Sequence, residues 1–255
     1  MKEYIMKKVI GMVIFSIFCI NITAQGNGNN YIFGWDYDDS IGVVSNNEIR
    51  LFRYYDDWQL LNSSINIPDG YTDIISYRFD FSIYDTIGVV NNNRIRFYGL
   101  SNGWHMMSGM DLVIEEDYKK VFNFVHSHNL GNSIGVVINN KVKVYFYNEY
   151  MKKWQTRDAA EFNLPNGYEN VFCYSPNNSD CYLGVIINNR LQFCSFSYKN
   201  LTWQNESDYD FILPDGYINV FGWGRNLCVV LSNIVKFYYY DTNYGWRKHD
   251  IEFNY

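Results

Sequence analysis

The sequence predicts an all-β protein, namely a five-bladed β-propeller of four-stranded antiparallel blades. Three observations support this prediction. The 255-residue chain contains 24 tyrosines, 18 phenylalanines and only 4 prolines, and aromatic residues at this level favour half-buried pleated sheet over helix. A set of short motifs recurs five times at intervals of about 47 residues, a period typical of propellers and solenoids. Each copy contains four runs with the composition of short strands.

Three motifs mark each copy of the repeat, always in the same order. An asparagine pair comes first and changes to Ser-Asn in the last copy; the five are Asn46-Asn47, Asn92-Asn93, Asn139-Asn140, Asn188-Asn189 and Ser232-Asn233. A tryptophan follows each pair, at Trp58, Trp104, Trp154, Trp203 and Trp246. A turn motif then closes the unit: PDGY at 68–71, EEDY at 115–118, PNGY at 165–168, PDGY at 214–217 and FNY at the end of the chain. Chance does not explain such an ordered repetition.

Each copy is predicted to form four strands. The first is a short aromatic run: YIFGW at 31–35, VFNF at 121–124, VFCY at 171–174 and VFGW at 220–223, with TDIISY at 72–77 as a weaker match. The second and third are IGVV and an alternating run such as KVKVYFY, whose period of two is that of a strand. Asn-Asn between them suits a tight hairpin because asparagine tolerates positive φ. The fourth begins near the tryptophan and often ends in a Pro-Asp-Gly or Pro-Asn-Gly turn.

The repeats are expected to pack around one axis, because a single blade cannot bury both of its faces. In the opening strand, Phe33 and Trp35 point to one face and Gly34 to the other, so bulky and small faces would alternate between blades. The last copy ends just after its fourth strand, so ring closure would rest on side-chain packing more than on a shared strand. The predicted blades span approximately 29–71, 72–118, 119–168, 169–217 and 218–255, in one domain of residues 25–255. An open solenoid is the alternative.

Residues 1–24 read as a secretory signal peptide. Lys2, Lys7 and Lys8 precede a short apolar run, and Ile22-Thr23-Ala24 offers a small-residue cleavage site. The prediction is therefore a secreted or exported protein, periplasmic, extracellular or on the cell surface, and an uncleaved anchor is the alternative. No later segment is apolar enough for a transmembrane span.

Charge and cysteine content limit the possible partners and cofactors. The formal net charge is −6, and loss of residues 1–24, with three lysines and one glutamate, would change it to about −8. An acidic chain offers little to a phosphate backbone, so no nucleic acid is expected as a partner. Cys173 and Cys181 flank a loop and could form a disulfide, which export permits; the alternative is that the cysteines are buried apolar side chains. No CxxC pair is present, so neither a zinc site nor another cofactor is predicted.

An enzyme needs unlike residues that break the repeat and converge, and few such breaks occur. His126 and His128 could share a metal if they lie on a strand; solvated loop histidines are the alternative. The patch WDYDDS could bind calcium or be a solvated turn, and its acids are Asp36, Asp38 and Asp39. Glycoside hydrolysis would need paired axial carboxylates, for which the candidates are Asp36, Asp80 and Glu169. Because the blades remain alike, the sequence favours a repeated role over a single catalytic site.

The repeat layout resembles that of the tachylectin-type five-bladed lectin propellers. The matching pieces are IGVVINNKVKVYF, Trp154 and PNGYENVFCY, and the resemblance extends over the whole chain after residue 24. It implies a five-bladed propeller and multivalent binding of amino-sugars. The family's Asn-Trp dipeptide and Gly-Gly-Trp loop are replaced here, the latter by Asp/Asn-Gly-Tyr.

The repeated aromatic and turn residues are the candidate binding residues. Sugars stack on aromatic rings while their hydroxyls meet a few placed polar groups, and the segment from the tryptophan to (D/N)GY offers both. The alternatives are packing tryptophans and ordinary turns. We therefore predict a secreted, non-catalytic, multivalent carbohydrate-binding protein; a protein-interaction or structural propeller on the cell surface and a glycoside-active enzyme are the alternatives. The candidate ligand-binding residues are Trp58, Asp69, Tyr71, Trp104, Trp154, Asn166, Tyr168, Trp203, Asp215, Tyr217 and Trp246.

Overall fold

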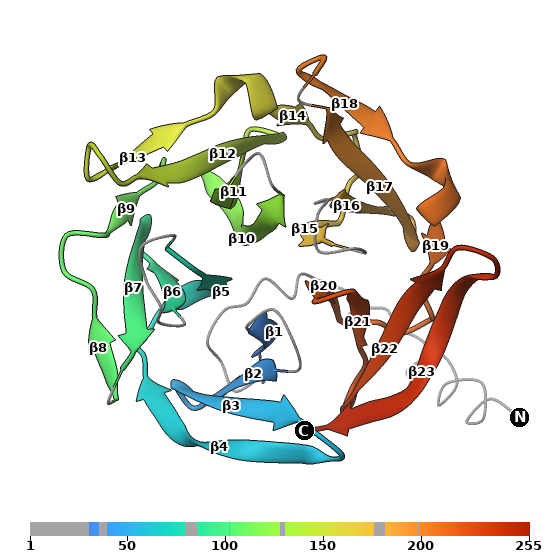
Figure 1. Cartoon of the computed structure of the whole chain (residues 1–255), viewed down its shortest axis with the longest axis horizontal. Helices are drawn as coiled ribbons and strands as arrows, with labels where there is room; N and C mark the ends of the chain where they lie inside the picture. The colour runs from blue at the N-terminus through green and yellow to red at the C-terminus, as the bar shows by residue number, and fades with distance from the viewer. Residues whose placement is uncertain are drawn as a thin grey trace, which may run out of the picture.

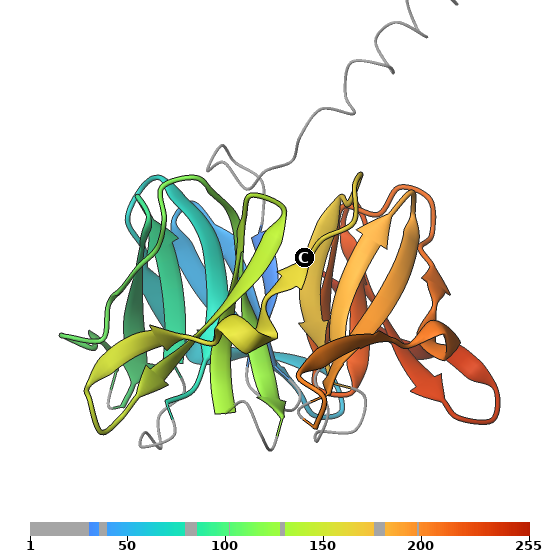
Figure 2. The ribbon, with the colours of Figure 1, turned by 90° about the horizontal axis from the view of Figure 1, so that it is seen from above.

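The computed structural model shows five sheets arranged around one central axis (Figure 1). It describes residues 31–35, 40–79, 86–101, 103–127, 131–175, 182–197 and 199–255, with only the backbone described at 125–127, 131 and 132. Seen from the side, the sheets stand roughly parallel to the axis as blades (Figure 2). We number the blades 1 to 5 along the chain. The prediction of an all-β, five-bladed propeller is confirmed.

Blades 1 and 5 each consist of four antiparallel strands in sequence order. Blade 1 comprises β1 (Tyr31–Trp35), β2 (Ser40–Ser45), β3 (Glu48–Tyr54) and β4 (Trp58–Asn66). Blade 5 comprises β20 (Asn219–Trp223), β21 (Asn226–Val230), β22 (Ile234–Asp241) and β23 (Gly245–Asn254).

Blades 2 to 4 have the same order, but their fourth strand is broken into two pieces that both pair with the third strand. Blade 2 comprises β5 (Tyr71–Tyr77), β6 (Thr86–Asn91), β7 (Arg94–Leu100), β8 (Trp104–Met106) and β9 (Leu112–Val113). Blade 3 comprises β10 (Tyr118–Ser127), β11 (Gly131–Ile138), β12 (Lys141–Asn148), β13 (Lys153–Thr156) and β14 (Phe162–Asn163). Blade 4 comprises β15 (Asn170–Tyr174), β16 (Tyr182–Ile187), β17 (Arg190–Ser197), β18 (Thr202–Asn205) and β19 (Phe211–Ile212). Short 3₁₀ turns, η1 (Asp158–Ala160) and η2 (Ser207–Tyr209), fill the breaks in blades 3 and 4.

The asparagine turns form as predicted. In the four Asn-Asn pairs both residues have φ between 47° and 61°, the geometry of a tight two-residue hairpin. Each turn also anchors the end of its own blade. The amide of Ile67 donates to the carbonyl of Asn47 at 2.8 Å, and the equivalent bonds join Ile114 to Asn93, Leu164 to Asn140, Leu213 to Asn189 and Tyr255 to Asn233.

The glycine of the IGVV motif makes room for the aromatic side chain of the first strand. Gly184 lies directly opposite Phe172, and a Cβ on Gly184 would lie 2.8 Å from Phe172 Cζ. Gly42 and Gly135 stand in the same relation to Phe33 and Phe122. In blades 1, 3 and 4, the glycine is therefore required because an aromatic ring crosses it.

The ring closes by packing and not by a shared strand, as expected. The innermost strands contact one another in the order β1, β5, β10, β15, β20 and back to β1. The apolar clusters lie between neighbouring blades, and one of them joins Ile41 and Val43 of blade 1 to Phe221, Trp223 and Phe237 of blade 5. All strands of each sheet come from consecutive sequence. The faces of adjacent blades therefore hold the ring together.

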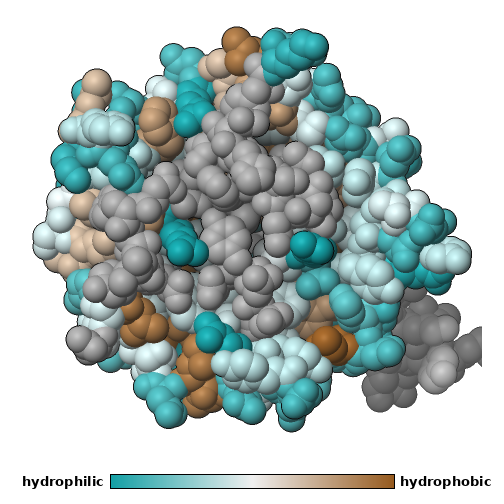
Figure 3. Space-filling view, viewed as in Figure 1, coloured by the Kyte–Doolittle hydropathy of each residue, from teal (hydrophilic) through white to brown (hydrophobic). Residues whose placement is uncertain are grey.

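Polar side chains prevail around the rim of the face shown in Figure 3, with small apolar patches between them. No helix in the described ranges is long and apolar enough to cross a membrane. The predicted signal peptide, residues 1–24, lies outside the described residues.

Candidate functional site

The five repeated tryptophans lie at the start of the fourth strands and pack against the preceding blade. The Trp154 ring stacks on Phe97 of blade 2, with centroids 5.4 Å apart. Trp246 stacks on Phe193 of blade 4 in the same way. Trp58 of blade 1 stacks on Phe237 of blade 5 and so joins the last blade to the first. We call the contacts of all five tryptophans with the preceding blade the tryptophan seam.

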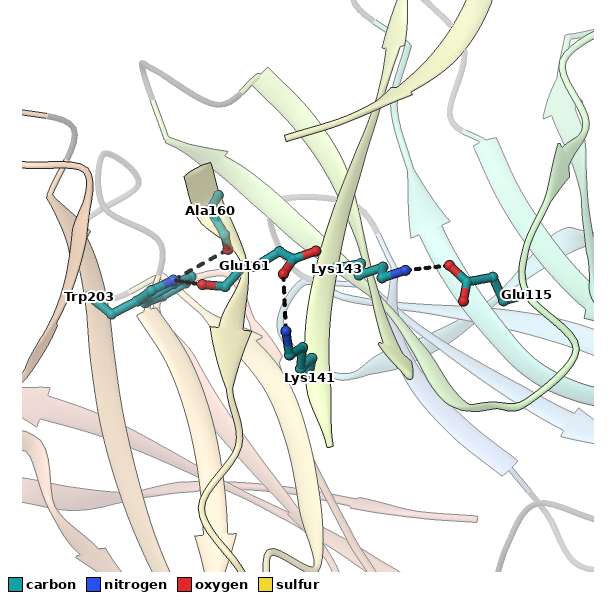
Figure 4. Close-up of polar contacts among 6 residues, drawn as sticks. All are labelled: Glu115, Lys141, Lys143, Ala160, Glu161 and Trp203. Carbon is teal, nitrogen blue, oxygen red and sulfur yellow. Dashed lines mark hydrogen bonds and ion pairs between the residues drawn. The ribbon is translucent and has the colours of Figure 1, made fainter. Parts of the chain in front are cut away.

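The indole N–H groups of the seam donate to backbone carbonyls of the preceding blade. Trp154 Nε1 donates to the Met110 carbonyl at 2.7 Å, and Trp246 Nε1 donates to that of Tyr209 at 2.8 Å. Trp203 donates to both Ala160 and Glu161, at 3.3 and 3.2 Å (Figure 4). These carbonyls lie where the fourth strands of blades 2 to 4 are broken, so each break exposes an acceptor for the next blade.

Where the preceding blade has an unbroken fourth strand, as in blades 5 and 1, no strand break offers an acceptor to the indole N–H. Trp58 Nε1 reaches the carbonyl of Glu252 in β23 at 3.1 Å. Trp104, which follows the unbroken β4, is buried at Nε1 and has no hydrogen-bond partner in the structure. Its ring lies 6.3 Å from that of Trp35. The indole hydrogen bond found at the other four blade boundaries is thus missing between blades 1 and 2.

The predicted turn residues lie at the opposite end of the fourth strand from the tryptophans. In β4, Trp58 and Asn66 are the two ends of a nine-residue strand, which spans roughly 26 Å at ~3.3 Å per residue. Asp69 follows that far end, where it accepts a hydrogen bond from the Asn47 side chain. The structure therefore does not bring the tryptophan and the (D/N)GY turn of a repeat into one site.

The tyrosines of these turns connect consecutive blades. Tyr71 is buried in the core between blades 1 and 2. Tyr217 Oη donates to Glu169 Oε2 at 2.6 Å, and the Lys119 ammonium lies 5.9 Å from the centre of the Tyr168 ring. Asn166 and Asp215 are exposed in their turns. These contacts show that the turn tyrosines connect neighbouring blades. A groove is found instead near the tryptophan end of the blades.

A groove with a volume of about 360 Å³ lies beside Trp154, between blades 2 and 3. Its walls include the aromatic rings of Tyr145, Tyr147 and Trp154 and the polar side chains of Asp111, Lys153 and Gln155. Burial raises the pKa of Tyr145 and that of Tyr147, so both hydroxyls stay protonated at neutral pH and can donate hydrogen bonds. An ion pair between Lys143 and Glu115 joins the two blades nearby (Figure 4).

A second polar cluster, which the sequence analysis missed, surrounds the central axis. Each innermost strand contributes one residue at the same register position, opposite the second residue of the Val-Val pair or its equivalent. We call these five residues the axial ring: Tyr31, Asp73, Lys120, Asn170 and Asn219. The sequence held a signal, because the residue two places before the central aromatic or aliphatic residue of each opening strand is polar in every copy and differs in charge between copies.

Of the side chains considered for catalysis or metal binding, the structure describes that of Glu169. His128, Asp36, Asp38, Asp39 and Asp80 lie outside the described residues, as does the side chain of His126. Glu169 accepts hydrogen bonds from Tyr217 and from the amide of Asn188, so it is engaged at a blade boundary. Within the described ranges, no group of three or more His, Cys, Asp and Glu side chains is arranged to hold a metal ion.

Cys173 is disulfide-bonded, and its predicted partner, Cys181, lies outside the described residues. Cys194 and Cys228 are free thiols, and burial raises the pKa of both. Neither thiol is thus activated as a nucleophile.

Comparisons with known proteins identify the fold. No family model and no curated protein matches the sequence. Among solved structures, the chain is similar to SapL1 lectin in complex with alpha-methyl fucoside, with 14% identity and a TM-score of 0.55 over 92% of this chain and 84% of that one. Weaker likenesses have a TM-score of 0.48: a Desulfotomaculum acetoxidans protein of undetermined function (10% identity, 90% and 71% covered) and a 6-phosphogluconolactonase candidate from Bacteroides uniformis (12% identity, 88% and 70% covered). The chain is a β-propeller whose fold is similar to that of a lectin.

Proposed function

We propose that this protein is an exported, non-catalytic propeller that binds glycans in grooves between its blades. The groove beside Trp154 is the observation that carries this proposal. Its volume of about 360 Å³ lies in the range of small-molecule sites, which combine apolar walls with a few oriented polar groups. The likeness of the fold to a lectin supports the same reading.

The groove offers the two kinds of contact that a sugar ring uses. The rings of Tyr145 and Trp154 supply apolar surface for the C–H faces of the sugar. The carboxylate of Asp111, the ammonium of Lys153 and the amide of Gln155 can bond its hydroxyls. Because the Trp154 N–H already donates to Met110, this ring is fixed in place and acts as a rigid platform.

Binding without catalysis is supported by the charge pattern of the groove. Asp111, the carboxylate in its lining, forms an ion pair with Arg94 at 3.3 Å. Glycoside hydrolysis in most families needs a second carboxyl group, on the far side of the scissile bond. Among the described residues that line this groove, none provides one.

A protein-binding role is the second candidate, and it is favoured by exposed apolar side chains. The turns that join the third and fourth strands carry Tyr55, Tyr150, Leu201 and Tyr244, which are 61%, 100%, 58% and 71% exposed. These turns all lie at the same end of the blades because the third strands run in the same direction. Exposed apolar side chains repeated at the same end of several blades are candidate contacts for a protein partner.

Glycan-array screening followed by calorimetry would test the proposal. We expect binding to one glycan class, weakened about tenfold by Lys153→Ala, since about 1.4 kcal/mol corresponds to a tenfold change in affinity. Lys199→Ala is the matched control, because Lys199 is an exposed lysine outside the groove. Absence of binding to every glycan, or equal loss of affinity in both variants, would refute glycan recognition at this groove.

A further inference from the structure

At the axial ring, equivalent positions of the five blades carry different polar side chains. Tyr31, Asp73, Lys120, Asn170 and Asn219 face Val44, Val90, Val137, Ile186 and Val230 across the first hairpin of their blades. The facing residues are all branched and apolar. The five ring positions therefore have the same backbone pairing but carry different side chains. One copy each of a carboxyl, an ammonium and a phenol, with two carboxamides, makes a single asymmetric site.

Hydrogen bonds link the members of the ring into a chain. Lys120 Nζ donates to Asn170 Oδ1, and Asn170 Nδ2 donates to Asn219 Oδ1 at 3.3 Å. Asp73 Oδ2 accepts the amide of Val121 at 3.3 Å. An ammonium has three N–H donors and a carboxamide has two, so these bonds leave donors on Lys120, Asn170 and Asn219. The ring is thus richer in donors than in acceptors.

The ring borders a cavity on the axis. The cavity has a volume of about 50 Å³, and Tyr31, Lys120 and Asn219 are in its lining. A water molecule needs roughly 10–15 Å³ of such volume, so the space suits three or four waters or a molecule of similar size. Further along the axis the innermost strands come very close, because a Cβ on Gly34 would lie 2.7 Å from the carbonyl of Gly222. A ligand would therefore be confined near the ring.

We propose that the axial ring binds one small carboxylate, of the size of acetate, through Lys120 and Asn219, which both line the cavity. The ammonium supplies the charge, and a charge-assisted hydrogen bond to a carboxylate is about twice as strong as a neutral one. The carboxamide of Asn219 supplies further N–H donors. When Asp73 is ionised, its charge offsets that of Lys120 and opposes this binding. The site is independent of the groove beside Trp154.

The pH dependence follows from the two charged members of the ring. Burial raises the pKa of Asp73 to about 7, and the nearby Lys120 acts in the opposite direction. Burial lowers the pKa of Lys120 to about 8, and Asp73 opposes that change. Both groups are protonated below about pH 7, when the ring carries a positive charge. Carboxylate binding should therefore be strongest in that range and weaken as the pH rises through 7 to 8.

The other titratable groups near the ring do not change this dependence. On β1 and β5, burial raises the pKa of the Tyr31 and Tyr71 phenols, so both stay neutral throughout this range. Lys119 and Glu169 are exposed residues next to the ring positions in sequence. Lys119 Nζ donates to Asn140 Oδ1 at 3.0 Å, and the Glu169 carboxylate accepts from Tyr217, so both are engaged at the surface.

Calorimetric titration with sodium acetate, at constant ionic strength, would test the proposal on the full chain. We expect one site, with affinity at about pH 6 at least tenfold higher than at about pH 8.5, a factor that corresponds to about 1.4 kcal/mol. Lys120→Met should abolish binding, and Lys119→Met is the matched control that should keep it. Equal binding by wild-type protein and Lys120→Met, or no acetate binding at either pH, would overturn the proposal.

Amine labelling of the wild-type protein gives a readout that does not depend on how the variants fold. Mass spectrometry can compare Lys120 with its neighbour Lys119 in one peptide. Acetate should slow the labelling of Lys120 and leave that of Lys119 unchanged. Equal protection of both lysines would indicate a general salt effect and count against the site. Glycine is the second probe, and stronger protection by glycine than by acetate would refute a simple carboxylate site in favour of one for a zwitterion.

Discussion

The tryptophan seam and the axial ring are two sets of five equivalent positions, and they have opposite chemistry. At the seam, all five blades place the same residue against the preceding blade. At the axis, the five blades place four different residue types at one register position. Every blade needs the same packing contact with its neighbour, so the tryptophan is the same in all five. The five axial residues surround one common cavity, so they can differ from blade to blade. Repetition at the seam therefore marks contacts that hold the blades together, and divergence at the axis marks the proposed carboxylate site.

The two sets also differ in their effect on stability. Each seam tryptophan buries apolar surface and adds ring stacking worth about 0.5–1.5 kcal/mol. The axial ring instead buries an ammonium and a carboxyl group, whose desolvation opposes folding. The seam should thus tolerate substitution poorly, while the effects of axial substitutions should depend on pH.

Trp154→Ala should have the largest effect on stability. It removes the ring that stacks on Phe97 and the hydrogen bond to Met110, and it opens a cavity between blades 2 and 3. We expect a loss of about 3–5 kcal/mol in the free energy of unfolding, as for other large aromatic truncations, measured by urea denaturation. A loss below about 1 kcal/mol would show that blade boundaries do not depend on the seam.

Gly184→Ala should destabilise the fold by about 1–3 kcal/mol, the usual range for overpacking. Its Cβ would lie 2.8 Å from Phe172 Cζ, so the ring would have to move within a buried hairpin. Gly99→Ala is the control, because the nearest atom to its Cβ would be His105 Cε1 at 3.4 Å. Thermal unfolding of both variants would check the difference, and similar midpoints would contradict this account of the glycine.

Trp154→Phe and Trp104→Phe separate the indole hydrogen bond from the ring contact. Phenylalanine keeps a ring and removes the N–H, which bonds to Met110 in the first case and has no partner in the second. We expect Trp154→Phe to be more destabilising by about 1 kcal/mol, the net value of an ordinary hydrogen bond. Urea denaturation gives the comparison. Equal losses would mean that the indole N–H contributes nothing to the seam.

Asp73→Asn should change how stability depends on pH. Because burial raises the pKa of Asp73 from 3.8 to about 7, the folded state holds a proton that the unfolded state has lost between these values. Stability from this group is therefore present at low pH and decreases as the pH rises from about 4 to 7, by at most about 1.4 kcal/mol per pH unit. Denaturation at several pH values should show a flatter slope in the variant, and an unchanged slope would refute this role for Asp73.

The hairpins could be predicted because their signals are local. The alternation of polar and apolar residues in KVKVYFY and the positive φ of Asn139 and Asn140 depend only on short stretches of chain. Each hairpin therefore formed where it was expected. The break in the fourth strand of blades 2 to 4 was missed, since it depends on how a later tryptophan meets an earlier carbonyl. The axial ring was missed because Tyr31 and Lys120 become neighbours of one axis only when the ring closes.

The candidate site was predicted in part. The sequence pointed to Trp154, which lies in the wall of the groove. It did not reveal that (D/N)GY turns lie at the other end of the blade, because the length and direction of the fourth strand decide that. Asp111 and Lys153 were not singled out, since they come from different blades and meet only through the packing of blade 2 on blade 3.

A crystal structure of the chain grown with acetate at about pH 6 would test most directly whether divergence at the axis makes a binding site. We expect one carboxylate within hydrogen-bond distance of Lys120 Nζ and Asn219 Nδ2, with the five seam tryptophans unchanged. Water alone at the axial ring, with acetate bound elsewhere or at several blades alike, would contradict it.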